Sequence, residues 1–442
     1  MQKLLLLGDE AIAQAALDAG LSGMYAYPGT PSTEIMEYVQ ASAQAEAGFV
    51  HREWSSNEKT AMEAALGMSY AGKRAMVAMK HVGLNVAADA FINSAVTGVN
   101  GGLVVVAADD PSMHSSQNEQ DSRFYGRFAL VPVMEPRNQQ EAYDMIFDAF
   151  SLSEKYRLPV LFRITTRLAH SRSAVARRAP LTQNSLVLPS DPRQFVLLPA
   201  IARKQYRALT SLYEQLHTDE LLDGNNRLSE GKGRGTGIIT CGIAFNYLME
   251  NIGGHENDYH ILSVGAYPLN RDKVAALVGK CDRVLVLEEG YPIIEEHLRG
   301  LLDRDVTVLG RLDGTVPRDG ELNPSIVAAA LGIETGRGKE VPQLVRQRPP
   351  SFCKGCGHAD LYAALAEVMA EAGPGRVFSD IGCYTLGALP PYNMVNSCVD
   401  MGASVTMAVG AADAGLFPAV AVIGDSTFTH SGMTGLLDAV IK

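Results

Sequence analysis

The sequence predicts an α/β protein built from three doubly wound, parallel-sheet domains. Short, uniformly apolar segments alternate with segments of helical periodicity, which is typical of strands buried in a parallel sheet. Two polar stretches divide this alternating pattern into three parts. The length of 442 residues agrees with that division, since one domain takes roughly 150 residues.

The first domain is expected to cover residues 1–180. Its turn Pro28-Gly29-Thr30-Pro31 leads into a helix expected to begin at Glu34, with Ser32 or Thr33 as its cap. A second helix is expected where small and apolar residues share one helical face, at 58–70. The apolar segments predicted as strands are 24–27, 75–79, 103–107 and 160–164.

The remaining chain is divided at two linkers. Residues 181–236 are expected to be an irregular connection, in which 222–237 is rich in glycine, asparagine and charge and is predicted to be an exposed linker. A second linker, 336–350, ends in Pro-Pro. They delimit a second domain, 237–335, and a third, 351–442. The strands predicted there are 238–241, 259–264, 284–287, 377–379 and 419–423.

Composition excludes several classes of protein. The formal net charge is −11 and the chain has no basic block, so a nucleic-acid binder is not expected. The N-terminal apolar run, 4–7, is too short for a signal peptide, and no long apolar window lacks a charge or a proline. A cytoplasmic protein without a membrane segment is therefore expected. Six cysteines in so long a chain predict metal or redox chemistry rather than a disulfide framework.

The first candidate site is Gly424-Asp425-Ser426, directly after an apolar strand. Ligands of open α/β sheets bind at the carboxyl ends of the strands. A glycine there lets the backbone approach a phosphate, and an aspartate there can hold a magnesium ion that bridges two phosphates. The alternative for this short motif is an ordinary turn.

A second candidate site consists of cysteines. Cys353 and Cys356 form a C-x-x-C pair, and Cys383 follows 27 residues after Cys356, at the end of a predicted strand. Three such cysteines in one domain can share an iron–sulfur cluster. A zinc site with His358 as the fourth ligand and a redox pair of thiols are the alternatives, and the spacing alone leaves all three open.

Taken together, C-x-G-C-G-H, D-I-G-C and the strand with G-D-S resemble the diphosphate-binding domain of the thiamine-diphosphate-dependent 2-oxoacid:ferredoxin oxidoreductases. The resemblance implies that Cys353, Cys356 and Cys383 hold a [4Fe-4S] cluster and that Asp425 binds Mg²⁺. It also implies a set of residues that line the cofactor site: Gly382, Cys383, Gly402, Gly424, Asp425 and Ser426.

The N-terminal domain resembles the pyrimidine-binding half of the same family. The string YPGTPST at 27–33 is similar to the family's turn, which implies that Gly29 and Thr30 face cofactor and substrate. Glu58 opens the pattern E-x-x-A-x-x-x-A-x-G and is implied to be the glutamate that protonates the aminopyrimidine ring. The alternative for Glu58 is a solvated first-turn residue favoured by the helix dipole, with Glu63 as a poorer match.

Two loops of this domain, 80–85 and 109–123, follow predicted strands and are expected to approach the substrate. Their candidates for binding a substrate carboxylate are Lys80, His81, His114 and Gln117, of which His81 and His114 are counted as catalytic candidates. Ordinary loop hydrogen bonding is the alternative for each of them.

The strings DIGCYTLG and VDMGAS, with both thiamine domains on one chain, resemble the indolepyruvate subfamily. This implies oxidative decarboxylation of an aryl 2-oxoacid to an acyl-coenzyme A, with electrons passed to ferredoxin. It also implies a transketolase C-terminal-like middle domain, a smaller beta subunit and an α2β2 assembly. Another 2-oxoacid substrate, a non-redox thiamine-dependent decarboxylase and an inactive fragment are the alternatives.

The sequence departs from the family pattern at its C-terminus. Lys442 lies 17 residues after Asp425, before the expected magnesium-binding asparagine and the expected ferredoxin-like domain. Cys398 is a weaker candidate for the fourth cluster ligand. We therefore expect a truncated chain that is inactive alone, with a third domain that exposes apolar surface.

Overall fold

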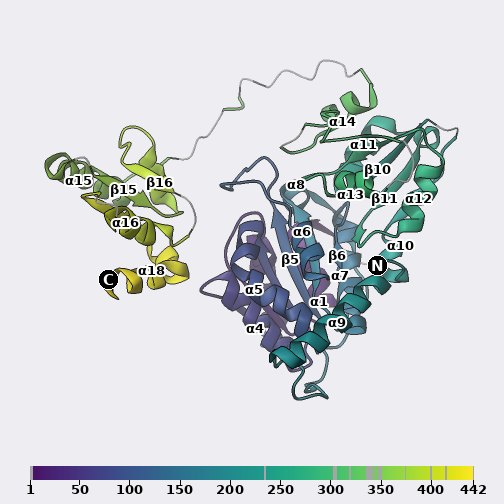
Figure 1. The fold of residues 1–442 in the computed structure, drawn as a ribbon, viewed down its shortest axis with the longest axis horizontal. Helices are drawn as coiled ribbons and strands as arrows, with labels where there is room; N and C mark the ends of the chain where they lie inside the picture. Colours follow the sequence, from purple (N-terminus) through teal and green to yellow (C-terminus); the bar gives the residue numbers. More distant parts are fainter. Residues whose placement is uncertain are drawn as a thin grey trace. The chain divides into compact units, whose positions relative to one another are not determined.

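The computed structural model describes residues 3–232, 235–301, 306–317, 320–334, 342, 344–346, 351–373, 375–398, 401–413 and 416–441. The chain forms two compact units, Met1–Gly336 and Arg337–Lys442 (Figure 1). Most of the predicted linker 336–350 lies outside the described residues. The predicted boundaries at 180 and 236 fall inside the first unit and remain a prediction.

The first unit contains a seven-stranded sheet whose strands are parallel except for one short edge strand. Every residue of its central strands β4, β5 and β7 is buried, as their apolar sequences predict. The four strands predicted for this domain are confirmed within a residue or two. In spatial order the strands are β12 (Ala266–Tyr267), β6 (Val133–Met134), β7 (Val160–Thr165), β5 (Leu103–Asp109), β4 (Ala75–Lys80), β2 (Gly23–Ala26) and β3 (His51–Trp54).

Helices pack against this sheet, and two of them begin at the candidate residues Glu58 and His81. Helix α4 (Glu58–Tyr70) has the predicted bounds and is capped by Asn57, whose side chain accepts a hydrogen bond from the Thr60 amide at 2.9 Å. The others are α1 (Gly8–Asp18), α2 (Thr33–Gln40), α3 (Ala43–Glu46), α5 (His81–Thr97), α6 (Arg123–Ala129), α7 (Gln139–Tyr156) and α8 (Thr166–His170); β1 (Lys3–Leu7) and β8 (Arg172–Ala176) form an antiparallel pair.

The predicted hydroxyl cap of α2 is wrong. Thr33 is already helical, and Ser32 makes no side-chain cap bond. Both hydroxyls instead bind the preceding turn: the Gly29 amide donates to Thr33 Oγ1 at 3.0 Å, and Ser32 Oγ donates to the Gly29 carbonyl at 2.8 Å. Side chains of this kind commonly satisfy turn backbone in this way, and here they hold the turn next to Thr30.

The expected irregular connection is also wrong in part. It contains the 18-residue helix α9 (Pro199–Leu216), which buries Leu209 and Leu216 against the first unit's core and has proline at its first turn. The expected exposed linker contains α10 (Glu220–Gly224) and β9 (Arg227–Ser229). Asn226 is buried there because its side-chain oxygen accepts bonds from the Gly265 and Ala266 amides.

A second sheet of five strands lies in the same unit and is parallel except at its β9 edge. The three strands predicted for this region are confirmed. The sheet order is β14 (Thr307–Leu309), β13 (Arg283–Leu287), β10 (Thr236–Cys241), β11 (His260–Val264) and β9; the helices are α11 (Ala244–Ile252), η1 (Glu256–Asp258), α12 (Arg271–Gly279), α13 (Ile293–Leu301) and α14 (Pro324–Leu331).

The second unit has a three-stranded parallel sheet in the order β16 (Val395–Cys398), β15 (Arg376–Ser379), β17 (Ala419–Val422). Both strands predicted here are confirmed. The other elements are α15 (Gly357–Ala372), η2 (Cys383–Ala388), α16 (Ala403–Asp413), α17 (Asp425–Thr427), the π-helix η3 (Phe428–Gly432) and α18 (Met433–Ile441). Apolar side chains of α18 are exposed, as expected for this part of the chain: Met433, Leu436, Leu437, Val440 and Ile441.

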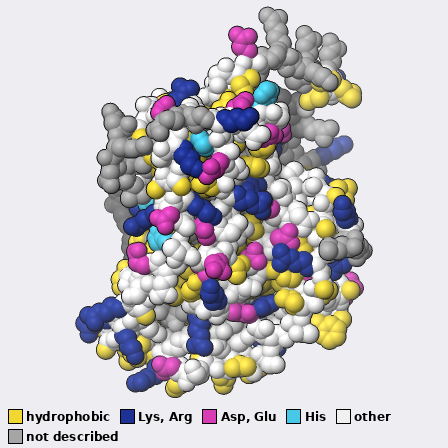
Figure 2. Space-filling model, turned by 90° about the vertical axis from the view of Figure 1, so that its right-hand side faces the viewer, with side chains coloured by type: hydrophobic (Ala, Val, Ile, Leu, Met, Phe, Trp, Pro, Cys, Tyr) yellow, Lys and Arg dark blue, Asp and Glu magenta, His cyan; other side chains and the backbone are white. Residues whose placement is uncertain are grey.

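The surface of the described residues mixes charges of both signs. On the face drawn in Figure 2, Lys and Arg side chains lie among Asp and Glu side chains rather than in one basic patch. Among the described residues, no helix is both long and apolar enough to cross a bilayer.

Candidate functional site

The carboxyl edge of the seven-stranded sheet gathers the N-terminal candidate residues. Strands β2, β4 and β5 run parallel and are hydrogen-bonded neighbours, so the loops that follow them meet at one edge. The turn with Gly29 and Thr30 follows β2, Lys80 and His81 stand at the end of β4, and Asp109 ends β5. This is the edge at which open α/β sheets bind ligands.

Hydrogen bonds join the loops at this edge. Lys80 Nζ donates to the Ser115 carbonyl at 2.5 Å, and Ser115 Oγ donates to the Thr30 carbonyl at 3.1 Å. Asp110 holds the same loop through the Ser115 amide at 2.8 Å. The exposed Thr30 side chain is therefore presented by a turn that two neighbouring loops support. Ser115 was not among the sequence candidates, because loop serines carry no distinctive pattern.

Glu58 is buried, with 6 % of its surface exposed, rather than solvated as the helix-dipole alternative requires. It opens α4, and its side chain lies against Gly83 in the first turn of α5. A Cβ atom at Gly83 would stand 2.6 Å from Glu58 Cγ, which real contacts do not allow. Glycine at 83 thus makes room for the Glu58 carboxylate beside the start of α5, where a helix dipole favours negative charge. Glu63, the fallback, is half exposed and pairs with Lys59.

The two candidate histidines have different surroundings. His81 is 1 % exposed, and neither of its ring nitrogens has a hydrogen-bond partner among the described residues. Buried polar atoms are rarely left in that state. His114 is about half exposed, and its Nε2 lies 2.6 Å from a carboxylate oxygen of Glu321. Gln117 is exposed.

Behind the edge lies a buried ion network that the sequence analysis missed. Arg163 Nε lies 2.6 Å from Asp109, and its Nη1 contacts Glu135. Arg123 Nη2 lies 2.5 Å from Asp121, and its Nη1 lies 3.0 Å from Glu288 on the second sheet. The available signal was an arginine in the middle of the apolar strand VLFRI, since a buried arginine requires carboxylate partners.

Within the network, the pKa of one carboxyl group is lowered from its ordinary value and the pKa of another is raised. Burial alone would raise the pKa of Asp121, but Arg123 and Arg163 hold it at about 2. Burial raises the pKa of Glu288 to about 7, although Arg123 acts to lower it. One carboxyl is thus charged at neutral pH while the other is close to half protonated.

In the second unit, the predicted glycines lie in loops at the carboxyl edge of the small sheet, and Asp425 begins helix α17 after the last of them. Gly382 follows β15, Gly402 precedes α16, and Gly424 follows β17. A Cβ at Gly424 would stand 2.7 Å from the Tyr384 ring, so the backbone there passes close to that ring. Tyr384 links the loop after β15 to the start of α17, because its hydroxyl lies 3.0 Å from both the Ile381 carbonyl oxygen and Thr427 Oγ1.

Asp380, in the D-I-G-C string, is a positioning residue that the sequence analysis did not single out. It is fully buried, and its carboxylate accepts hydrogen bonds from the Gly402 amide at 2.6 Å and the Ser404 amide at 3.2 Å. It thereby fixes the start of α16 next to β15. The signal in the sequence was an aspartate at the end of a buried strand.

Asp425 and Ser426 are exposed at the start of α17. An exposed carboxylate beside a close-passing backbone matches the hard oxygen ligand that Mg²⁺ takes together with phosphate oxygens. Among the described residues, Asp425 belongs to no group of three ligand atoms gathered within 4.8 Å. The residues present therefore fit one protein ligand of a phosphate-bound Mg²⁺ ion.

The cysteines of the second unit are accessible. Cys353 and Cys383 are exposed and Cys356 is partly exposed, with Cys356 Sγ 3.5 Å from His358 Nδ1. The described residues place no three of these donor atoms within 4.8 Å of one another, as a single ion would require. A cluster of four irons holds its cysteines farther apart than one ion does. Cys398 Sγ contacts the Asp380 carbonyl at 3.6 Å.

Comparison with known proteins agrees with this geometry. The family model "Pyruvate flavodoxin/ferredoxin oxidoreductase, thiamine diP-bdg" matches residues 14–204. A 2-oxoglutarate:ferredoxin oxidoreductase from Magnetococcus marinus has a similar structure, with a TM-score of 0.61 and 17 % identity, covering 75 % of this chain and 65 % of that one. At that identity the likeness shows a shared fold.

Curated relatives extend the match to nearly the whole sequence. Indolepyruvate oxidoreductase subunit IorA of Methanothermobacter marburgensis is 42 % identical, and that of Archaeoglobus fulgidus is 40 % identical. Each alignment covers 99 % of this chain and 73 % of the relative. The chain therefore belongs to the indolepyruvate oxidoreductase subunit IorA family, whose members are 2-oxoacid oxidoreductases with a thiamine-diphosphate-binding domain.

Proposed function

We propose that this chain is the thiamine-diphosphate-binding subunit of an enzyme that oxidatively decarboxylates an aryl 2-oxoacid, such as indolepyruvate, to an acyl-coenzyme A with ferredoxin as electron acceptor. The observation that carries the proposal is the buried Glu58 carboxylate, which Gly83 accommodates at the ligand-binding edge of the sheet. The aryl substrate is supported by the names of the relatives.

Glu58 has the role of a proton-holding group. Bound thiamine diphosphate supplies the carbon nucleophile and the electron sink of the reaction. Glu58 holds a proton at its carboxylate against the aminopyrimidine ring nitrogen and so tunes the ring. Burial suits this role, because a carboxyl group removed from water interacts more strongly with the ring than an exposed one does.

Thr30, Lys80 and His81 form the substrate side of the proposed site. The Lys80–Ser115–Thr30 hydrogen bonds keep the turn in place. His81 offers two ring nitrogens that have no partner among the described residues to a 2-oxoacid carboxylate or ketone. His114 is a weaker candidate, because its ring already pairs with Glu321.

The second unit supplies the metal and electron-transfer groups of the proposal. Asp425 holds Mg²⁺ on the diphosphate, and Cys353, Cys356 and Cys383 hold a [4Fe-4S] cluster that passes electrons on. Accessible thiols and an exposed carboxylate support both roles. A beta subunit in an α2β2 assembly, ferredoxin and coenzyme A are the proposed partners, in the cytoplasm.

The test compares Glu58→Gln with Glu63→Gln in the complex with the partner subunit. We expect Glu58→Gln to lower indolepyruvate-dependent reduction of ferredoxin by roughly 10²- to 10⁴-fold, the usual share of a positioned proton-transfer group. Glu63→Gln, on the same helix but exposed, should keep the activity. Equal activity of the two variants would refute the role of Glu58.

The same assay separates oxidation from simple decarboxylation. Carbon dioxide release without ferredoxin reduction, by a complex whose iron and sulfide analysis is blank, would identify a non-redox decarboxylase and overturn the electron-transfer part of the proposal.

A further inference from the structure

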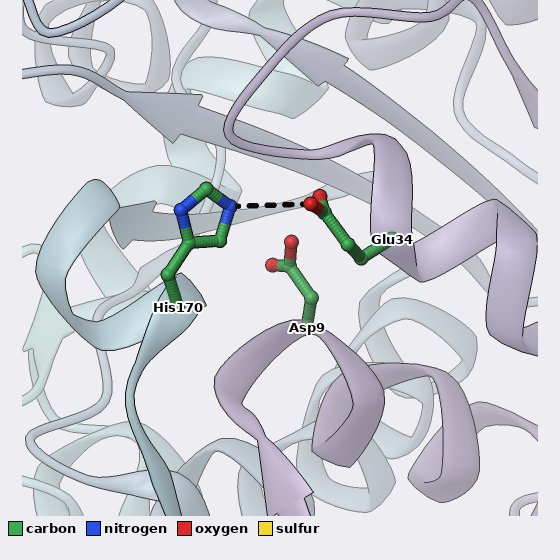
Figure 3. Close-up of side chains that lie close together, drawn as sticks. All are labelled: Asp9, Glu34 and His170. Atoms are coloured by element: carbon green, nitrogen blue, oxygen red, sulfur yellow. Dashed lines mark ion pairs between the residues drawn. The ribbon is translucent and has the colours of Figure 1, made fainter. Parts of the chain in front are cut away.

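Three ligand-type side chains meet at one point of the first unit, outside the residues assigned to the thiamine site. Asp9 is the second residue of α1, Glu34 is the second residue of α2, and His170 ends α8. One donor atom from each lies within 4.8 Å of the other two. Figure 3 shows the three side chains pointing toward one another. Among the described residues this is the only such group.

The buried carboxylate of Asp9 is the main reason to expect a ligand at this cluster. Asp9 is fully buried, and among the described residues no N–H or hydroxyl group donates a hydrogen bond to either of its carboxylate oxygens. It makes no ion pair with any described lysine or arginine. A buried, unpaired carboxylate is costly, so the protein must compensate it with a bound proton or a bound cation.

The acidic groups around Asp9 favour a bound cation. The acidic Glu34 and Glu10 lie near the buried Asp9 carboxyl group, and the Glu34 carboxyl is within hydrogen-bonding reach of it. Glu10 is engaged elsewhere, since its carboxylate accepts from the Leu7 amide at 2.8 Å and lies 3.7 Å from Arg172. Two carboxyl groups therefore face one small volume together with an imidazole, which pairs with Glu34.

The spacing suits a single ion. His170 Nε2 and Glu34 Oε1 are 3.5 Å apart. Two ligands of one tetrahedral ion, each about 2.1 Å from it, are separated by about 3.4 Å. Glu34 and His170 each expose about a third of their side chains, which leaves one side open for water ligands. Close packing supports the arrangement, because a Cβ at Gly8 would stand 2.9 Å from the Leu168 carbonyl carbon of α8.

We propose that Asp9, Glu34 and His170 form a binding site for a divalent transition-metal ion such as Mn²⁺ or Zn²⁺. One imidazole and two carboxylates are a ligand set that suits these ions. The ion carries two positive charges, which neutralise the two carboxylates and bind them together. It joins α1, α2 and α8, and it fixes the first turn of α2 four residues after Thr30. The site is independent of the proposed catalytic function.

The test measures binding of Mn²⁺ to the full chain by equilibrium dialysis and by loss of the free-ion spin-resonance signal. All proteins carry Asp425→Asn, which removes the proposed magnesium ligand, and Mn²⁺ is used because thiols bind it poorly. We expect one equivalent to bind, and Asp9→Asn or His170→Ala to weaken binding at least tenfold.

The matched control is His51→Ala. His51 and Glu53 form an exposed pair at 3.3 Å, similar to the His170–Glu34 pair but without a buried carboxylate beside it. This variant should bind Mn²⁺ normally. As a second measurement, Mn²⁺ should raise the unfolding temperature of the parent protein but not of His170→Ala, because an ion that binds only the folded state stabilises it.

Absence of Mn²⁺ binding, or binding that Asp9→Asn and His170→Ala leave unchanged, overturns the proposal; the two carboxyl groups then share a proton instead. The measurement needs no thiamine diphosphate, partner subunit or 2-oxoacid. A failure here is therefore distinguishable from a failure of the proposed function. If Asp9→Asn does not fold, His170→Ala decides the matter, since its side chain is partly exposed.

Discussion

The two units hold their candidate cofactor residues in different ways. In both, candidate cofactor residues occupy loops at the carboxyl edge of a parallel sheet. In the first unit these loops are tied to each other by Lys80 and Ser115, above a buried network of arginines and carboxylates. In the second unit Cys353, Cys383 and Asp425 are exposed, and the core cluster consists of Tyr362, Val377, Tyr384 and Val422.

This difference shows how the candidate residues of each unit depend on the protein around them. The candidate residues of the first unit are positioned by contacts made inside that unit, so a change there should affect stability and geometry together. The exposed groups of the second unit contribute little to packing. A substitution at one of them should leave stability nearly unchanged and should alter only the binding of a metal, a cluster or a diphosphate.

The largest effect is expected from Arg163→Met in the buried network. Removing this guanidinium leaves Asp109 and Glu135 buried without their main partner. Breaking a buried pair on one side costs about 3–5 kcal/mol of unfolding free energy, which denaturant titration can measure. Lys59→Ala, at an exposed pair with Glu63, is the control and should cost less than about 1 kcal/mol. Similar losses in both variants would contradict the contrast between buried and exposed charges.

A slightly smaller effect is expected in the pH dependence of stability. In the unfolded chain Glu288 loses its proton near 4.5, its ordinary value, whereas in the folded chain it keeps the proton to about 7. Because the folded state binds the proton more tightly, its contribution is fully present below pH 4.5 and declines as pH rises to 7. The decline amounts to about 3 kcal/mol.

Glu288→Gln should remove this decline, so the difference in unfolding free energy between variant and parent should change across pH 4.5–7. Denaturant titrations at several pH values measure it, with the exposed Glu63→Gln as the control. If the unfolding free energies of Glu288→Gln and the parent change with pH in the same way, burial does not raise the pKa of Glu288.

The smallest effects are expected in the second unit. Asp380→Asn weakens the charged acceptor of the Gly402 and Ser404 amides and should cost about 1–3 kcal/mol. Faster hydrogen exchange of the backbone amides at the start of α16 would show this loss of stability. Asp425→Asn, at an exposed position, should change stability by less than about 0.5 kcal/mol. A large stability loss for Asp425→Asn would show that this carboxylate has a structural role.

Local signals predicted the elements well where burial and periodicity agree. Helix α4 has the predicted bounds because Asn57 caps it and its small residues face the core. Helix α9 was missed, although Pro199 and the spacing of Leu209 and Leu216 were available, because its exposed face is polar and its flanks lack a clear strand. The misassigned cap at Ser32 shows the same limit, since a hydroxyl can bind either the helix or the turn before it.

Sequence patterns were enough to predict the parallel α/β architecture, the family and the candidate residues Thr30, Glu58 and Asp425, because these depend on near neighbours in the chain. Which distant residues meet became known only from the folded structure. Gly83 accommodates Glu58, Arg123 joins two sheets through Glu288, and Asp9 faces Glu34 and His170. The physical reason is that burial and charge pairing depend on contacts between segments far apart in sequence, which no local pattern records.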